Sequence, residues 1–298
     1  MKVPALLFLC ALLPLAATAA EDTDALIGRA RAFADEANLQ EAVSLLKTAE
    51  VLAPENKKMM VYLELGVDLR KAGNYRECIE YYNKAAKLSP KMADIYYNIG
   101  LAYYYQGMYN KAITYYGRAI EISPKYTEAF GAMAMAYRDD GMGEIAVKTI
   151  KKALEIDPNY AGGYNILANC FEDRGWHSQA IEMYRRAIIL RPDYASAFYN
   201  LGCVLDATGQ YEAAVDAYNQ ALKLDKNADT YYNLGQAYMA VKNYYNAQDA
   251  FKESIRLNSG NENAYKYLVI SLDEAGMKRE AAYWEGQEAS RFGKSAGE

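Results

Sequence analysis

The residue types that carry most enzyme chemistry are scarce in this sequence. It contains one histidine, His177, which follows Gly175 and Trp176 in a stretch expected to be a turn between helices. A single histidine excludes most histidine-based catalysis and most metal clusters. The patterns G-x-x-x-x-G-K-[ST], H-E-x-x-H and C-x-x-C do not occur. The sequence therefore predicts a protein that is not an enzyme and that uses no metal and no cofactor.

The cysteines give no redox or disulfide signal. Beyond the N-terminal apolar segment the chain keeps Cys78, Cys170 and Cys203, an odd and sparse set. Cys170 and Cys203 fall on expected neighbouring helices, about 8–10 Å apart. A disulfide needs Cα atoms about 4.4–6.8 Å apart, so we expect no bridge between them.

Tyrosine is abundant instead. The chain has 29 tyrosines among 298 residues, and the segment 101–117 reads LAYYYQGMYNKAITYYG. A tyrosine can fill a core, or it can present a rigid aromatic face and a hydroxyl to a partner. Which role each one has depends on the helices that carry it.

The sequence repeats itself with a period of about 34 residues. Residues 96–126 and 231–261 align in pattern without a gap. Small residues recur at two sites per unit, where two helices would approach closely, and glycine recurs after the first helix, where a left-handed residue ends a helix best. Five units also end near a proline. The first small site reads Ala30, Gly66, Gly100, Ala134, Ala168, Gly202, Gly235 and Val269, and the second reads Ala42, Cys78, Ala112, Ala146, Ala180, Ala214, Ala247 and Ala281.

These units resemble the tetratricopeptide repeat. The resemblance covers nearly all of the chain after residue 22 and implies an all-α fold, an α-α superhelix or solenoid of about eight helix-turn-helix repeats. Glycine is replaced by Ala37 and Lys242 in two units. The repeats are placed at 23–56, 59–92, 93–126, 127–160, 161–194, 195–227, 228–261 and 262–290, and a C-terminal tail follows at 291–298.

The third unit carries more tyrosines than its core requires. Four of them fall on packing positions: Tyr96, Tyr103, Tyr109 and Tyr116. Four other residues follow the spacing i, i+4, i+7, i+8, which makes a second stripe on the first helix: Tyr97, Leu101, Tyr104 and Tyr105. The resemblance implies that this stripe lines the concave surface of the superhelix, where partners bind. Packing against a neighbouring helix is the alternative role.

The same positions in other units complete the predicted groove. Asn98, Asn200 and Asn233 share one position, where some members of the family hold a partner's backbone with a ladder of asparagines. The alternative is that asparagine is simply the common choice in such repeats. The predicted partner-binding residues are Tyr97, Asn98, Leu101, Tyr104, Tyr105, Met135, Arg138, Asn165, Asn169, Tyr199, Asn200, Tyr232, Asn233 and Met239.

The charge of the chain is acidic, with a formal net charge of -5 and a pI near 5.3. Without basic runs, this balance argues against nucleic acid and against an anionic membrane surface. Groove positions from the third unit onward also lean acidic, although Arg138 opposes them and the second unit adds Arg70 and Lys71. We therefore expect a neutral or basic protein or peptide segment as the partner. The lysine–asparagine pair of family members that clamp a terminal carboxylate is missing.

The N-terminus reads MKVPALLFLCALLPLAATAA, one cation followed by an apolar run and small residues. Ala17-Thr18-Ala19 fits a cleavage site, so residues 1–20 are predicted to be a secretory signal peptide. An uncleaved membrane anchor is the alternative, in which case this segment would be the only membrane contact. Secretion across the inner membrane to a bacterial periplasm is the expected localisation.

Together these observations predict a non-catalytic scaffold or assembly factor of the cell envelope, which binds a protein or peptide segment in its concave groove. A structural homo-oligomer is the second possibility. An unrecognised enzyme directed at the cell wall is the third, and the missing catalytic constellation speaks against it.

Overall fold

A computed structural model describes residues 22–293 of the chain. In this part of the protein sixteen α-helices follow one another, and no strand occurs. The helices group into two compact units that divide after Pro124. The predicted all-α array of about eight helix pairs is confirmed.

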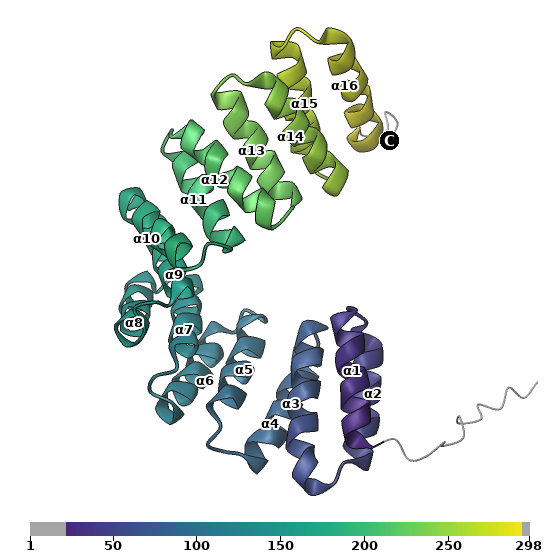
Figure 1. Ribbon diagram of the computed structural model, residues 1–298, viewed down its shortest axis with the longest axis vertical. Helices are drawn as coiled ribbons and strands as arrows, with labels where there is room; N and C mark the ends of the chain where they lie inside the picture. The colour runs from purple at the N-terminus through teal and green to yellow at the C-terminus, as the bar shows by residue number, and fades with distance from the viewer. Residues whose placement is uncertain (1–21, 294–298) are drawn as a thin grey trace, which may run out of the picture. The chain divides into compact units, whose positions relative to one another are not determined.

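The N-terminal unit, residues 22–124, contains three helix pairs. Each helix contacts the next one along the chain, and the first helices of successive pairs also contact each other. Its helices, purple to blue-green in Figure 1, are α1 (Thr23–Asp35), α2 (Leu39–Leu52), α3 (Glu55–Lys71), α4 (Tyr75–Leu88), α5 (Ala93–Tyr104) and α6 (Tyr109–Ile122).

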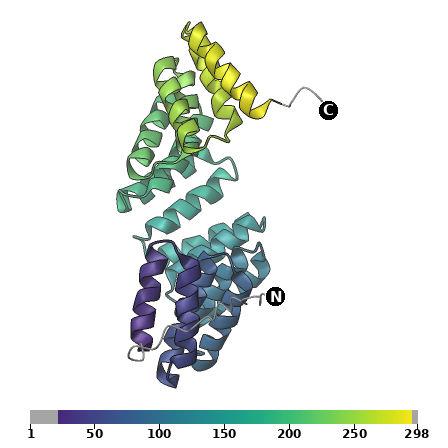
Figure 2. The ribbon, with the colours of Figure 1, turned by 90° about the vertical axis from the view of Figure 1, so that its right-hand side faces the viewer.

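The C-terminal unit, residues 125–293, contains five helix pairs stacked in chain order. Figures 1 and 2 show this order most clearly for the three pairs from α11 onward. Its helices are α7 (Thr127–Asp139), α8 (Gly143–Ile156), α9 (Ala161–Glu172), α10 (His177–Leu190), α11 (Ala195–Ala207), α12 (Tyr211–Leu224), α13 (Ala228–Ala240), α14 (Tyr244–Leu257), α15 (Glu262–Glu274) and α16 (Lys278–Phe292).

The turn inside every pair contains one residue with a left-handed backbone. Six of these residues are the predicted glycines, and the other two are Ala37 and Lys242, with φ of 60° and 59°. The turn therefore keeps its conformation where glycine is absent, although a side chain at positive φ costs about 1–2 kcal/mol. The packing of the two helices outweighs this local strain.

The small sites are the places where helices meet. All eight residues of the second site are buried, as predicted. At the first site, the ring of Tyr116 in α6 packs against Gly100 in α5, so that a Cβ on Gly100 would be 2.6 Å from two carbons of the ring. Gly66 and Tyr82 repeat this arrangement one pair earlier, at 2.5 Å. Glycine at these points makes room for a whole aromatic ring between the two helices of a pair.

The ends of the array differ in detail from the predicted boundaries. Helix α3 begins at Glu55, before the boundary predicted at residue 59. Helix α16 extends to Phe292, whose ring packs edge-on against Tyr265 at 5.4 Å, so the first two residues of the predicted tail belong to the last helix. The predicted signal peptide, residues 1–20, lies outside the described residues. Between residues 22 and 293, no helix is both long and apolar enough to cross a bilayer.

Candidate partner-binding surface

The predicted groove residues fall on two surfaces, one in each unit. We call the residues on α5 and at its end the N-terminal stripe: Tyr97, Asn98, Leu101, Tyr104 and Tyr105. We call the residues on α7, α9, α11 and α13 the C-terminal stripe: Met135, Arg138, Asn165, Asn169, Tyr199, Asn200, Tyr232, Asn233 and Met239.

Tyr105 is the most accessible residue of the N-terminal stripe. Its side chain is 54% exposed and stacks on the ring of Tyr75, with centroids 6.0 Å apart and planes 13° from parallel. Tyr104 touches the Tyr105 ring edge-on at 5.7 Å and the Tyr109 ring at the same distance. These four rings form a continuous aromatic surface at the end of α5.

The rest of this stripe is less separate from the core than the sequence suggests. Tyr97 is half-buried and packs on the fully buried Tyr116, with centroids 5.8 Å apart. The assignment of Tyr103 and Tyr109 to the core is also wrong, since both are half-buried. One helix of 12 residues cannot separate a core face from a binding face when it and its neighbour α6 carry seven tyrosines. Tyr105 is the one residue of this stripe that is mostly exposed.

The asparagines of the predicted ladder make contacts inside the protein. Asn98 donates to the carbonyl of Asp94, one turn earlier in its own helix, at 2.8 Å. Asn200 donates to the side chain of Asn165 in the preceding pair at 3.4 Å, and its amide nitrogen lies 3.3 Å from the side-chain amide of Asn169. Asparagine at this position therefore links repeats, and in α5 it bonds only to its own helix.

Asn233 continues this pattern in the next pair. Its amide nitrogen lies 3.2 Å from the hydroxyl of Tyr199 and 3.9 Å from the sulfur of Cys203.

A charged network occupies the middle of the C-terminal stripe. Arg138 forms ion pairs with Asp139 at 3.1 Å and with Asp173 at 3.4 Å. The Asn169 amide satisfies its neighbours when its oxygen faces Arg138, because it then accepts from the guanidinium at 3.1 Å and its nitrogen donates to the Asn165 carbonyl at 3.2 Å. These side chains hold one another in place across α7 and α9.

The buried Tyr184 connects this network to the core. Its hydroxyl donates to the Glu172 carboxylate at 2.6 Å and lies 2.5 Å from the Asn169 side chain. Burial, and then the hydrogen bond to Glu172, raise the pKa of Tyr184. A carboxylate on the first helix of a pair can thus bind the tyrosine hydroxyl that comes from the second helix.

The far end of the C-terminal stripe is aromatic. Tyr232 packs against Phe251 at 6.0 Å and edge-on against Tyr267 at 5.9 Å, and its hydroxyl accepts from Gln236 at 3.1 Å. Met239 packs against the same core cluster, and Met135 is half-buried on α7. A partner could therefore contact only part of each of these side chains.

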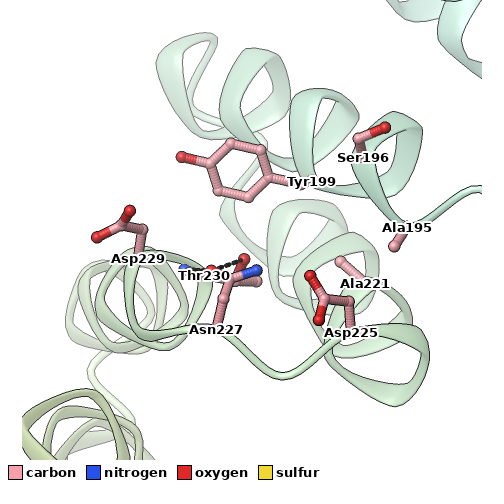
Figure 3. A pocket seen from close by; sticks show the side chains of 8 residues that line it. All are labelled: Ala195, Ser196, Tyr199, Ala221, Asp225, Asn227, Asp229 and Thr230. Atoms are coloured by element: carbon pink, nitrogen blue, oxygen red, sulfur yellow. Dashed lines mark hydrogen bonds between the residues drawn. The ribbon is translucent and has the colours of Figure 1, made fainter. Parts of the chain in front are cut away.

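One feature beside the C-terminal stripe could not be read as a site from the sequence. A pocket of 280 Å³ opens between the start of α11, the end of α12 and the start of α13 (Figure 3). It contains the Tyr199 ring and two carboxylates, Asp225 and Asp229. The sequence does mark this repeat as unusual, because the sixth unit is one residue shorter than the units before and after it and lacks the proline near its end, which changes the turn between α12 and α13. The lining residues are Ala195, Ser196, Tyr199, Ala221, Asp225, Asn227, Asp229 and Thr230.

The nucleophile candidates are poorly suited to chemistry. Cys170 is buried, and burial raises the pKa of its thiol to about 11, while Cys78 has its pKa raised to about 12 for the same reason. Such thiols stay protonated near neutral pH and react slowly. Cys203 is also a free thiol. Within residues 22–293 no three His, Cys, Asp or Glu side chains are placed to share a metal ion.

The family comparisons agree with the repeat pattern. One family model of the tetratricopeptide repeat matches residues 93–126 and 228–261. A second family model of the same repeat matches residues 127–160. The related TPR repeat model matches 66–107, 169–206 and 205–242. A search of the curated proteins finds no match.

Solved structures show the same fold at low sequence identity. A tetratricopeptide repeat protein from Parabacteroides merdae superposes with a TM-score of 0.62 at 20% identity, over 84% of this chain and 98% of that one. PilF of Pseudomonas aeruginosa superposes with a TM-score of 0.60 at 20% identity, over 69% of this chain and 94% of that one. The APC/C hetero-tetramer Cut9-Hcn1 superposes with a TM-score of 0.61 at 18% identity, over 93% of this chain and 54% of that one. At such identities the likeness concerns the fold alone.

Proposed function

This chain belongs to the tetratricopeptide repeat family, and we propose that it is a protein-binding scaffold of the cell envelope that holds segments of its partner on the N-terminal and on the C-terminal stripe. Repeat arrays of this family bind protein partners in general, without chemistry of their own. The specific surface, the partner's character and the location are our proposal.

The observation that carries the proposal is the exposed aromatic surface at the end of α5. Tyr105 is 54% exposed, although its neighbours Tyr75 and Tyr104 shield part of its ring. Tyrosine is favoured at interfaces because a large rigid apolar face carries a polar tip and loses little entropy on binding. The packing of the helix pair does not require this ring, so a partner is the simplest use for it.

The charges support a partner segment that is neutral or basic where it meets the C-terminal stripe. Asp225 and Asp229 lie in one pocket with the Tyr199 ring, a setting that suits a lysine or arginine side chain (Figure 3). Arg138 is already engaged by Asp139 and Asp173 and adds no free positive charge. Complementary charge of this kind favours the encounter and selects among partners.

The test is capture of a partner from an envelope extract by the wild-type chain and two tyrosine variants. Tyr105→Ala removes the exposed ring of the N-terminal stripe. Tyr245→Ala is the matched control, because Tyr245 is 67% exposed on α14 and belongs to neither stripe. We expect Tyr105→Ala to weaken partner affinity about tenfold to hundredfold, the effect of losing an aromatic anchor, and Tyr245→Ala to leave it unchanged.

Equal capture by both variants would show that the N-terminal stripe is not the binding surface. Molar mass measured in solution over a range of concentrations tests the second function, the homo-oligomer. A mass that rises with concentration, and falls back in Tyr105→Ala, would identify a second copy of the chain as the occupant.

A further inference from the structure

Three of the buried polar atoms without a hydrogen-bond partner lie in the N-terminal unit. They are Nε of Arg70 on α3 and the hydroxyls of Tyr82 on α4 and Tyr116 on α6. Among the described residues only Nδ1 of His177 shares this condition. All three are donors, and a buried donor without an acceptor costs about 1–3 kcal/mol. A ligand that brings a hydrogen-bond acceptor to these donors would remove this cost.

These atoms belong to one region beneath the face formed by α3 and α5. Tyr82 and Tyr116 are fully buried, occupy equivalent positions in successive repeats and lie against Gly66 and Gly100 in the same way. Burial raises the pKa of both tyrosines, while Arg70 opposes the shift in both. Helix α3, which ends with Arg70 and Lys71, contacts both α4 and α5, and α5 contacts α6, so the guanidinium lies in the same part of the unit as both hydroxyls.

The C-terminal unit shows which group satisfies such a hydroxyl. Tyr184 occupies the position of Tyr82 in its own repeat and donates to the carboxylate of Glu172 at 2.6 Å. The residue equivalent to Glu172 in the repeat of Tyr82 is Arg70. The acceptor that one repeat supplies from its own first helix is thus replaced in the other by a cation.

No acid of the N-terminal unit takes the place of this acceptor. Arg70 is half-buried, its Nε has no hydrogen-bond partner, and the exposed Lys71 follows it. Glu64 is paired with Arg31. Asp68 is buried, and burial raises its pKa, but it is not bonded to either hydroxyl, and Asp35 is exposed.

We propose that Arg70, with the hydroxyls of Tyr82 and Tyr116 behind it, is a receiving site for a side-chain carboxylate of the bound segment. This inference rests on the proposed function, since it names one residue class of the partner. The guanidinium binds a carboxylate through two parallel hydrogen bonds, and the hydroxyls stabilise the guanidinium and the carboxylate from the buried side. Arg70 lies on α3 and Tyr97 on the neighbouring α5, so a segment bound along the N-terminal stripe can reach Arg70 without ending there, and an aspartate or glutamate within the segment fits better than a chain end. The partner is therefore acidic at this point and basic at the C-terminal stripe.

The test uses the full chain and a small probe, so that it does not depend on finding the partner. The Nε–H signal of Arg70 and the ring signals of Tyr116 are followed by NMR during titration with N-acetylglutamate N-methylamide. The matched neutral probe is N-acetylglutamine N-methylamide, and N-acetylalanine supplies a terminal carboxylate. We expect saturable shifts with the glutamate probe and none with the glutamine probe.

Two variants separate a specific site from general attraction. Arg70→Gln is expected to lower the affinity for the glutamate probe about tenfold or more, because a charge-assisted bidentate contact is lost. The affinity is measured in this variant from the Tyr116 signals. Lys71→Met removes the same charge one residue away and is expected to change the affinity less than about twofold, as exposed charges usually do.

Equal shifts with the glutamate and glutamine probes, or an unchanged affinity in Arg70→Gln, would overturn the site. Tighter binding of N-acetylalanine than of the glutamate probe would overturn the assignment to a side chain. Failure of the proposed function has a different signature, equal capture by the Tyr105→Ala and Tyr245→Ala variants.

Discussion

The contact between Gly100 and Tyr116 allows the packing at the first small site to be measured. In Gly100→Ala, the new Cβ would lie 2.6 Å from two carbons of the Tyr116 ring, where ordinary contact begins at 3.4 Å. The ring or the helix must therefore move by about 0.8 Å, the difference of these two values. Tyr116 is fully buried and Tyr97 packs on it, so the movement spreads into the core. Overpacking of this kind costs about 1–3 kcal/mol.

Gly117→Ala in α6 is the matched control. Gly117 is also inside a helix of the same repeat, but a Cβ there would have no atom within 4 Å. Replacing a mid-helix glycine by alanine contributes about 0.5–1 kcal/mol of stability in both variants. This gain cancels in the comparison, and the difference between the two free energies of unfolding isolates the overpacking cost.

The assay is urea unfolding of both variants, fitted with a nearest-neighbour description, because repeat arrays do not have to unfold in one step. We expect Gly100→Ala to be less stable than Gly117→Ala by about 1–3 kcal/mol. If both alanines stabilise the chain equally, the ring of Tyr116 does not lie on Gly100 and the arrangement of the pair is wrong.

Three further outcomes follow from single residues. Lys242→Gly should raise the free energy of unfolding by about 0.5–1 kcal/mol in urea melts, because Lys242 has a φ of 59° that glycine adopts without strain, and a loss of stability would contradict this. Tyr116→Phe should raise the free energy of unfolding by up to about 1–3 kcal/mol, because it removes a buried hydroxyl without a partner, while it weakens binding of the glutamate probe. N-terminal sequencing of the exported protein should begin at Ala20 or Glu21, and intact Met1 in the membrane fraction would support the anchor.

The helix pairs could be predicted because each repeat position has its own physical requirement. Ala146 and its seven equivalents must be small where two helices touch, and all of them are buried. The left-handed turn residue could be located from its glycines even in the two repeats that use Ala37 and Lys242. Eight copies of one pattern average out the local exceptions, which is why the period identified the fold.

The binding surface could be predicted only in outline. Spacing placed Tyr97, Tyr104 and Tyr105 on one side of a helix, but it could not show that Tyr97 packs on Tyr116 while Tyr105 stays exposed. The contacts of Asn200 and Asn233 cross from one repeat to the previous one, and a pattern within one repeat does not contain them. Exposure and partner choice depend on neighbouring repeats, whose side chains differ at every step.

In several repeats an aromatic ring packs on the glycine of the first small site, and whether this ring carries a hydroxyl bears on partner binding. Repeat seven uses Phe251 on Gly235 at the same close distance, 2.5 Å, so packing alone is satisfied without a hydroxyl. In repeat five the hydroxyl of Tyr184 is explained by Glu172. Tyr116 has neither explanation, because its hydroxyl is buried and has no acceptor in the described chain. A phenylalanine there would avoid the cost of an unmet donor, about 1–3 kcal/mol. An acceptor brought by a bound segment accounts for the hydroxyl, and it locates that acceptor beside Arg70.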